Sequence, residues 1–157
     1  DFDRLKEIAQ TTFEDLRGAP QPLLRPDEMI SLSIPRGSLT PEERGEIESH
    51  VTFTYRFLSR IPWTRDLKGV PNIAYAHHEK LNGSGYPRSL EAENIPLQSR
   101  IMTIADIYDA LTASDRPYKR AVPRDKALDI LHSDAKRGAL DSALLRIFVE
   151  AEVFKLV

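Results

Sequence analysis

The chain has 157 residues, of which 41% are hydrophobic and 29% charged, and this length and composition are typical of one globular domain with its own core. Its 22 basic and 24 acidic residues give a formal charge of -2, and no charged tail is present to attract nucleic acid or anionic lipid, so we expect neither DNA nor a membrane as a partner. It contains no cysteine, which excludes a disulfide framework, a thiolate zinc site and a cysteine nucleophile.

The N-terminal part is predicted to contain two helices separated by an extended connector. Apolar residues recur at helical spacing over residues 5–16, which predicts one amphipathic helix that stops at Gly18. Residues 18–26 hold three prolines and cannot form a regular helix, so we expect an extended connector and then a short helix at 27–32. No segment shows the sustained alternation of apolar and polar residues that indicates a strand.

Two further helices are predicted to carry histidines. Thr40-Pro-Glu-Glu43 is a helix-start signature, with Thr as the N-cap and Glu three residues later, and it predicts a long helix to about residue 60. His50 lies on one edge of the apolar stripe of that helix. A second helix is predicted over residues 72–79 and ends beside the turn-rich stretch 82–87.

The C-terminal half is predicted to be helical as well. Residues 96–114 form an apolar helical pattern that contains Asp106 and Asp109, and carboxylates in such a helix require a partner. A basic turn at 115–120 is followed by amphipathic helices at 123–136 and 142–154. We therefore expect a single all-α domain over 1–157, a compact bundle of about six or seven helices.

Three histidines and one aspartate are candidate metal ligands: His50, His77, His78 and Asp106. Neutral imidazole with carboxylate is a ligand set for iron, manganese or zinc. Adjacent histidines on a helix diverge by about 100°, so they serve two ions more easily than one, and two ions clamp a phosphodiester for attack by an activated water. Two alternatives remain open: a lone histidine such as His50 is more often a surface residue, and the aspartates could merely pair with Arg100 or Arg116.

One string gives the candidate ligands a context. His77-His-Glu-Lys-Leu-Asn-Gly-Ser-Gly-Tyr-Pro87 resembles the signature HHExxDGxGYP of the HD-GYP family, a bacterial branch of the HD-type metal-dependent phosphohydrolases. Further matches lie at 39–43, before the helix that bears His50, at 105–112 and at 115–119. The resemblance spans about residues 34–135.

The resemblance implies an α-helical, HD-like domain that hydrolyses cyclic di-GMP to pGpG or GMP with two or three iron or manganese ions. It assigns the metal ligands to His50, His77, His78 and Asp106, the substrate loop to Gly85, Tyr86 and Pro87, and contacts near the phosphates to Arg116 and Lys119. Glu79 and Asp109 are expected to support catalysis by acting on the metal ligands and not by binding the metal themselves. The family also implies cytoplasmic signalling, a sensory or receiver domain upstream, and contact with diguanylate cyclase domains of the GGDEF type.

Two positions depart from the family pattern. No His-Asp dipeptide occurs in the chain, although that pair supplies ligands in the family, and Asn82 stands where the motif prefers Asp. Four ligands leave two octahedral ions short of donors, so we expect metal to bind weakly or not at all and this chain alone to be incomplete or inactive. The alternative is a degenerate module that binds cyclic di-GMP or a partner signalling domain without catalysis. A third hypothesis is that a chain shortened by one or more core helices exposes apolar surface and forms a homodimer.

Overall fold

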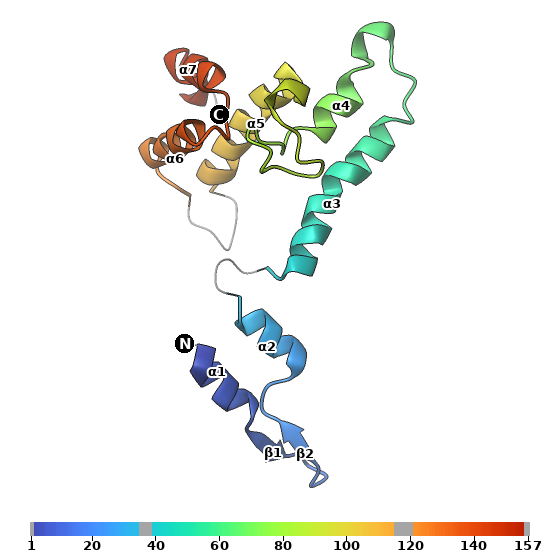
Figure 1. Cartoon of the computed structure of the whole chain (residues 1–157), viewed down its shortest axis with the longest axis vertical. Helices are drawn as coiled ribbons and strands as arrows, with labels where there is room; N and C mark the ends of the chain where they lie inside the picture. Colours follow the sequence, from blue (N-terminus) through green and yellow to red (C-terminus); the bar gives the residue numbers. More distant parts are fainter. Residues whose placement is uncertain (1, 35–38, 115–120, 156–157) are drawn as a thin grey trace. The chain divides into compact units, whose positions relative to one another are not determined.

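The computed structural model describes residues 2–34, 39–114 and 121–155 (Figure 1). In the described residues the elements in chain order are α1 (Phe2–Ala9), β1 (Thr12–Glu14), β2 (Pro20–Pro22), α2 (Pro26–Leu32), α3 (Pro41–Leu58), α4 (Val70–Tyr75), α5 (Leu97–Thr112), α6 (Arg124–Lys136) and α7 (Ser142–Glu150). Three short 3-10 turns lie at Arg65–Leu67, Ala92–Asn94 and Val153–Lys155. The predicted all-α class is confirmed. None of the described helices is long and apolar enough to cross a membrane.

The chain divides into two compact units, Asp1–Ile47 and Glu48–Val157. The boundary falls inside the continuous helix α3, so the expectation of a single domain stays a prediction. Within the first unit, α1 contacts α2, and β1 pairs antiparallel with β2. No described residue of this unit is buried.

The predicted helix over 5–16 is wrong in its second half, because α1 ends at Ala9 and the chain then forms the hairpin of β1 and β2. A turn at Asp15 drives this change: its carboxylate accepts hydrogen bonds from the amides of Arg17 (2.8 Å) and Ala19 (3.0 Å). Gly18 takes the positive φ of 73° that the turn requires. Side chains such as Asp bond to nearby backbone in turns and so compete with the helix.

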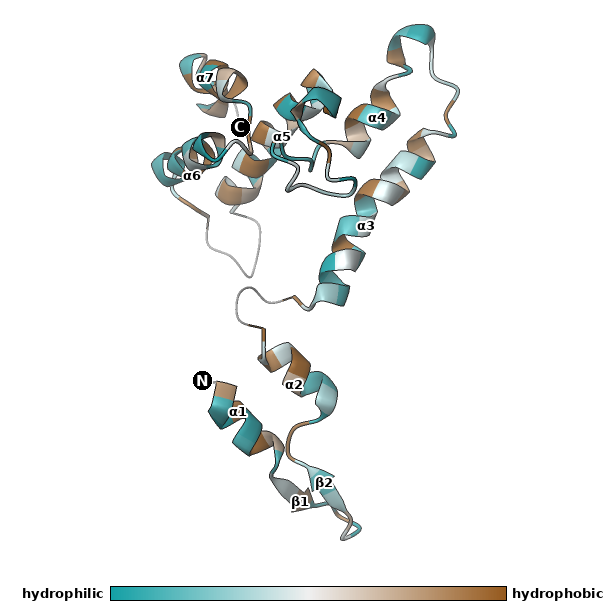
Figure 2. Cartoon of the chain, in the orientation of Figure 1, coloured by the Kyte–Doolittle hydropathy of each residue, from teal (hydrophilic) through white to brown (hydrophobic). Residues whose placement is uncertain are grey.

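The core of the second unit lies among α5, α6 and α7, which are neighbours in Figure 1. Their hydrophobic residues alternate with hydrophilic ones around each helix (Figure 2). The buried members of this core are Ile104, Tyr108, Ala127, Leu131, Leu140, Leu145, Phe148 and Phe154. The last predicted helix is shorter than expected: α7 ends at Glu150, and Phe154 reaches the core from a 3-10 turn.

Candidate metal centre

The helix that precedes the two adjacent histidines stops earlier than the sequence predicts. Instead of running to Glu79, α4 ends at Tyr75, and His77 and His78 lie in the turn that follows. A longer helix would use the carbonyl of His77 for the amide of Leu81. That amide instead donates to the carbonyl of Ala139 (3.0 Å), so the chain leaves the helix and enters the loop.

Two buried hydroxyls on α5 hold this turn in place. Ser99 Oγ donates to the carbonyl of Ile73 (2.8 Å), and Thr103 Oγ1 lies 2.7 Å from the carbonyl of His77. Both side chains are almost fully buried, at 0% and 3% exposure. A lost partner for a buried polar group costs about 1–3 kcal/mol, so these contacts fix the backbone of the first histidine against α5.

The three predicted histidines come together. His50 projects from α3, and its ring centroid lies 6.1 Å from that of His77 and 5.2 Å from that of His78. One nitrogen from each of the three residues lies within 4.8 Å of the others. Two nitrogens bound to the same ion at about 2.1 Å are at most about 4.2 Å apart, so small side-chain movements would allow all three to reach one divalent cation.

The adjacent histidines are prepared for ligation. His77 Nδ1 lies 2.6 Å from the carbonyl of Ala74. Because a carbonyl only accepts, Nδ1 carries a proton, so that in the neutral ring Nε2 holds the lone pair that a metal would bind. Burial, with the neighbouring His77 ring, lowers the pKa of His78 to about 4. His78 is therefore neutral at physiological pH, the form that binds metal.

The fourth predicted ligand lies beside this cluster. Asp106 Oδ2 on α5 is 3.6 Å from His78 Nδ1, and its side chain is 48% exposed. Arg100, one of the partners considered for the aspartates, is occupied elsewhere, because it binds Asp141 (3.2 Å) and the carbonyls of Ala92 and Ile95. Arg100 therefore does not pair with Asp106, and Arg116, the other partner considered, lies outside the described residues; the role of Asp106 as a metal ligand remains a prediction.

Asp109 lies about one helical turn after Asp106 on α5, and it lines a cavity. It is exposed, and the cavity of about 420 Å³ is also lined by Tyr108, Thr112 and Arg124. The predicted part of Asp109 in catalysis stays a prediction.

Glu79, the other residue predicted to support catalysis, is 2% exposed. Its Oε1 accepts from the amide of Arg88 (2.8 Å), and its Oε2 accepts from the amide of Leu90 (2.9 Å). A buried carboxylate is tolerated when it is hydrogen-bonded in this way. Both oxygens are thus engaged in closing the loop over residues 79–90, and a direct part for Glu79 in the chemistry stays a prediction.

The predicted substrate loop folds back onto the histidine turn. A Cβ at Gly85 would lie 2.4 Å from the Cα of Glu79, so only glycine fits there. This close approach brings the ring of Tyr86 to 4.8 Å from that of His78. Burial raises the pKa of Tyr86 from its usual value near 10 to about 12, so its hydroxyl is protonated at neutral pH, as in an ordinary tyrosine, and can donate a hydrogen bond. The peptide bond from Tyr86 to Pro87 is cis.

Asn82, the departure within the motif, makes a turn that the sequence predicts for this residue. Its Oδ1 accepts from the amide (3.2 Å) and the hydroxyl (2.7 Å) of Ser84. Its Nδ2 donates to the carbonyl of Arg137 (3.4 Å) at the end of α6. An aspartate could not make the second contact, since an ionised carboxylate only accepts.

Arg116 and Lys119, the predicted cations near the phosphates, lie outside the described residues. Sequence reasoning missed three other residues that shape the site: Ser99, Thr103 and Arg88. Ser99 and Thr103 have one detectable signal in the sequence, because they are two small hydroxyl residues spaced by four in an apolar helix. Arg88 covers the ring of Tyr75 at 4.5 Å, a contact that no sequence pattern indicates.

Comparison with known proteins shows which family this helical chain, with its candidate metal site, belongs to. A family model described as HD domain matches residues 23–144, and the chain belongs to the HD domain family. Its motif over 77–87 makes it an HD domain of the HD-GYP type, as the sequence predicts.

Three relatives resemble the chain over much of its length. It is 42% identical over 98 residues, or 62% of this chain and 20% of the relative, to the 3'3'-cGAMP-specific phosphodiesterase 3 of Vibrio cholerae. It is 41% identical over 110 residues, 70% of this chain and 28% of the relative, to the cyclic di-GMP phosphodiesterase response regulator RpfG of Xanthomonas campestris. A cyclic di-GMP phosphodiesterase of Thermotoga maritima is 41% identical over 97 residues, 62% of this chain and 26% of the relative. The chain thus spans between 20% and 28% of the length of these three relatives.

HD domains are metal-dependent, and the donors of this chain suit a divalent cation. The cluster offers three imidazole nitrogens within 4.8 Å of one another, with a carboxylate oxygen 3.6 Å from His78. Nitrogen with oxygen donors suits iron, manganese or zinc and does not choose among them. The predicted dependence on a divalent metal is therefore supported by the chemistry of the donors, while the identity and number of the ions stay predictions.

Proposed function

We propose that the chain is a cyclic dinucleotide phosphodiesterase module in which His50, His77, His78 and Asp106 hold a divalent cation, iron or manganese, beside the substrate loop. The single observation that carries this proposal is the convergence of three imidazole nitrogens within 4.8 Å. A bound cation would supply electrostatic stabilisation of the phosphodiester and lower the pKa of a coordinated water.

The loop beside the histidines supports a nucleotide as the ligand. Gly85 holds Tyr86 and Pro87 against the histidine turn, where the aromatic ring can stack on a base. The protonated hydroxyl of Tyr86 donates a hydrogen bond to an anion or a base edge. Arg116 and Lys119 would add positive charge near the phosphates. Relatives named for cyclic di-GMP and for 3'3'-cGAMP support a cyclic dinucleotide substrate, with cyclic di-GMP as the first candidate.

We further propose that these residues alone hydrolyse the nucleotide slowly or not at all. Iron and manganese prefer about six donors, and four protein ligands shared between two ions leave most positions to water. The second candidate function is a module that binds cyclic di-GMP without catalysis, and it rests on the same lack of protein ligands for the metal ions.

RpfG is named a response regulator, which supports an upstream receiver domain as a partner. A GGDEF-type partner, a homodimer and a cytoplasmic location remain further proposals from the resemblance.

The test is to load the chain with manganese or ferrous iron, to measure bound metal by elemental analysis, and to measure cyclic di-GMP binding and hydrolysis in parallel. We expect weakly bound metal, nucleotide binding and at most slow turnover. Replacing both His77 and His78 by Ala should abolish metal binding. The matched control is His132→Ala, because His132 is an exposed histidine on α6, and it should bind metal as the native chain does.

Each outcome separates the proposals. Rapid turnover that disappears with the two histidines would show that the visible ligands suffice and would overturn the proposed incompleteness. Nucleotide binding without metal would favour the non-catalytic module. The absence of both metal and nucleotide binding would overturn the proposed function. 3'3'-cGAMP, tested in the same way, decides which cyclic dinucleotide is preferred.

A further inference from the structure

The segment at residues 56–69, which comprises the last residues of α3 and the turn before α4 and is called the turn below, carries a local excess of positive charge. It contains four cations, Arg56, Arg60, Arg65 and Lys68, and one acid, Asp66, which is a local charge of +3 in a chain of net charge -2. None of these four cations forms an ion pair within the described part of the chain. The turn is therefore a positive surface whose charges are available to another molecule.

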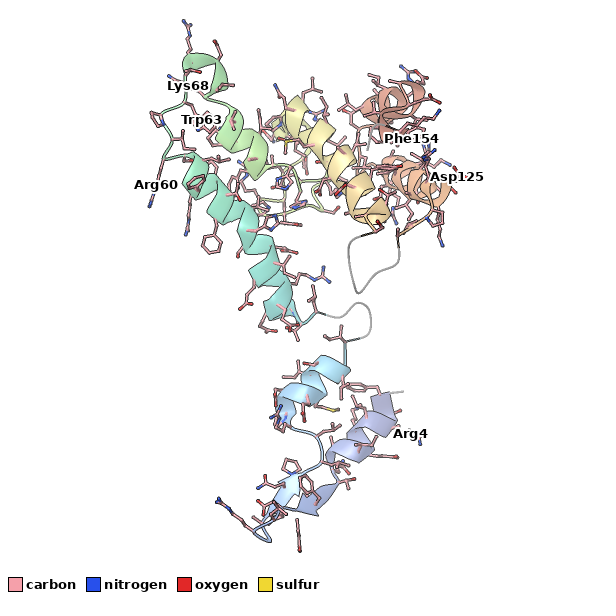
Figure 3. All side chains as sticks on the ribbon, turned by 180° about the vertical axis from the view of Figure 1, so that it is seen from behind. Arg4, Arg60, Trp63, Lys68, Asp125 and Phe154 are labelled. Atoms are coloured by element: carbon pink, nitrogen blue, oxygen red, sulfur yellow. The ribbon has the colours of Figure 1, made fainter. Side chains whose placement is uncertain are left out.

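A groove opens in the same turn. It has a volume of about 320 Å³ and is lined by Tyr55, Ser59, Ile61, Trp63, Lys68, Pro71 and Asn72. Trp63 and Lys68 both line the groove, and Figure 3 shows them in this turn, with Arg60 just after the end of α3. The groove thus combines aromatic and aliphatic walls with a cation on its edge.

The walls of the groove are fixed before any ligand binds. Trp63 Nε1 donates to the carbonyl of Leu58 (2.8 Å), which holds the indole ring in place. Tyr55 stacks on Tyr75 with ring centroids 4.3 Å apart, and the guanidinium of Arg88 lies over the Tyr75 ring, 4.5 Å from its centroid. A preformed pocket loses little conformational entropy on binding, which favours affinity.

Two large apolar side chains of the same turn are exposed, and one of them, Ile61, lines the groove. Ile61 is 36% exposed and Leu67 is 48% exposed. Aromatic pockets surrounded by exposed apolar residues and cations are typical of protein interaction sites, where a buried anchor carries most of the binding energy. None of the residues lining the groove is a proposed metal ligand or part of the substrate loop.

We propose that this turn docks an acidic segment of a partner protein. One apolar side chain of that segment enters the groove beside Trp63, and its carboxylates face Lys68 and Arg60. The charge of the turn selects an acidic partner, and the concave groove selects a peptide with a protruding side chain. An anionic membrane fits less well, because membrane surfaces bind protruding apolar residues and not a cavity.

Trp63 is the only tryptophan of the chain, so its fluorescence reports on the groove directly. The probe is a synthetic peptide of alternating Glu and Leu residues, added to the full chain at low salt. A second peptide with Lys in place of every Glu keeps the apolar residues and reverses the charge. We expect a saturable change in Trp63 emission with the acidic peptide alone, weakened by high salt because salt screens exposed charges.

The variant Lys68→Glu, alone and with Arg60→Glu, tests the charges of the turn. We expect each to weaken acidic peptide binding, the double variant by about tenfold or more, since like charges replace opposite ones. The matched control is Lys126→Glu on α6, an exposed lysine without an ion pair among the described residues, which should bind the peptide as the native chain does. Thermal melting of all three variants verifies that they fold.

Three results would overturn the proposal: no saturable change with the acidic peptide, equal binding of the two peptides, or binding that Lys68→Glu leaves intact in a folded chain. Vesicles of phosphatidylglycerol form the last arm of the experiment. A change in Trp63 emission with these vesicles but not with the acidic peptide would assign the turn to a membrane instead. Metal binding at the histidines is measured separately, so neither proposal depends on the other.

Discussion

Two regions of the second unit hold their shape by different forces. The core among α5, α6 and α7 is apolar, with Leu131 fully buried and Leu145 at 1% exposure. The loop over residues 79–90 is held instead by hydrogen bonds from backbone amides to Glu79 and by the close packing of Gly85. The core should therefore set the stability of the unit, while the loop should set the geometry of the site.

This difference separates what a substitution does to stability from what it does to the site. Burial of apolar area is additive and spread over many residues, so the loss of one core side chain lowers the stability of the whole unit. A loop closed by one carboxylate and one glycine depends on single atoms, and its failure is local. Variants in the two regions should thus be distinguishable by where they increase amide exchange.

The largest effect is expected in the core. Leu131→Ala should lower the free energy of unfolding by about 2–5 kcal/mol, because it removes buried methyl groups and leaves a cavity. Urea denaturation followed by circular dichroism measures this change. The matched control is Leu97→Ala at the start of α5, where the side chain is 55% exposed. Equal losses in the two variants would contradict the view that the core carries the stability.

Glu79→Gln should come next, with a local cost of about 1–3 kcal/mol. The amide group of Gln keeps one acceptor and turns a donor toward the other backbone amide, so either Arg88 or Leu90 loses its partner. Amide hydrogen exchange should increase at these two residues while exchange in α6 changes little. Glu93→Gln, an exposed residue of the Ala92–Asn94 turn, is the control. Unchanged exchange at Arg88 and Leu90 would show that the carboxylate does not close the loop.

Gly85→Ala should displace the loop at a cost of roughly 1–3 kcal/mol, because the added Cβ overlaps backbone atoms of Glu79 and Lys80 that have little room to move. Nucleotide binding should weaken while metal binding at the histidines persists. The control Gly45→Ala lies in α3 with open space around its Cα and should instead stabilise the helix slightly. Native nucleotide affinity in Gly85→Ala would contradict a role for this loop in substrate binding.

The sequence predicts the core region well because its signals are local. Apolar periodicity and caps place the helices that become α3, α5 and α6 within about two residues of their observed ends. The predicted capping box is confirmed, since Thr40 and Glu43 exchange hydrogen bonds between side chains and backbone amides. The N-terminal helix fails because the turn at Asp15, formed by one side chain and Gly18, outweighs helical spacing over residues 12–16.

The sequence predicts that the three histidines belong to one site, but it does not predict the contacts that hold them in place. The histidines converge as the motif implies, yet the end of α4 depends on Ser99 and Thr103, which lie more than twenty residues later in the sequence. The sequence shows Glu79 only as a third titratable group next to two histidines. In the structure, both of its carboxylate oxygens accept hydrogen bonds from backbone amides of the loop. Hydrogen bonds between distant segments leave no periodic signal, so a sequence pattern cannot reveal them.

The smallest predicted effect concerns strain inside the loop. Ser89 has a φ of 51°, a conformation that is unfavourable for residues with a Cβ and neutral for glycine. Ser89→Gly should therefore stabilise the loop by up to about 1 kcal/mol, less the weak hydrogen bond from Ser89 Oγ to the carbonyl of Gly85 (3.3 Å). Ser89→Ala separates the two contributions, because it removes the hydroxyl and keeps the strain. Slower exchange at the Leu90 amide in Ser89→Gly but not in Ser89→Ala would assign the effect to the backbone, whereas faster exchange in both would mean that the hydroxyl matters more than the strain.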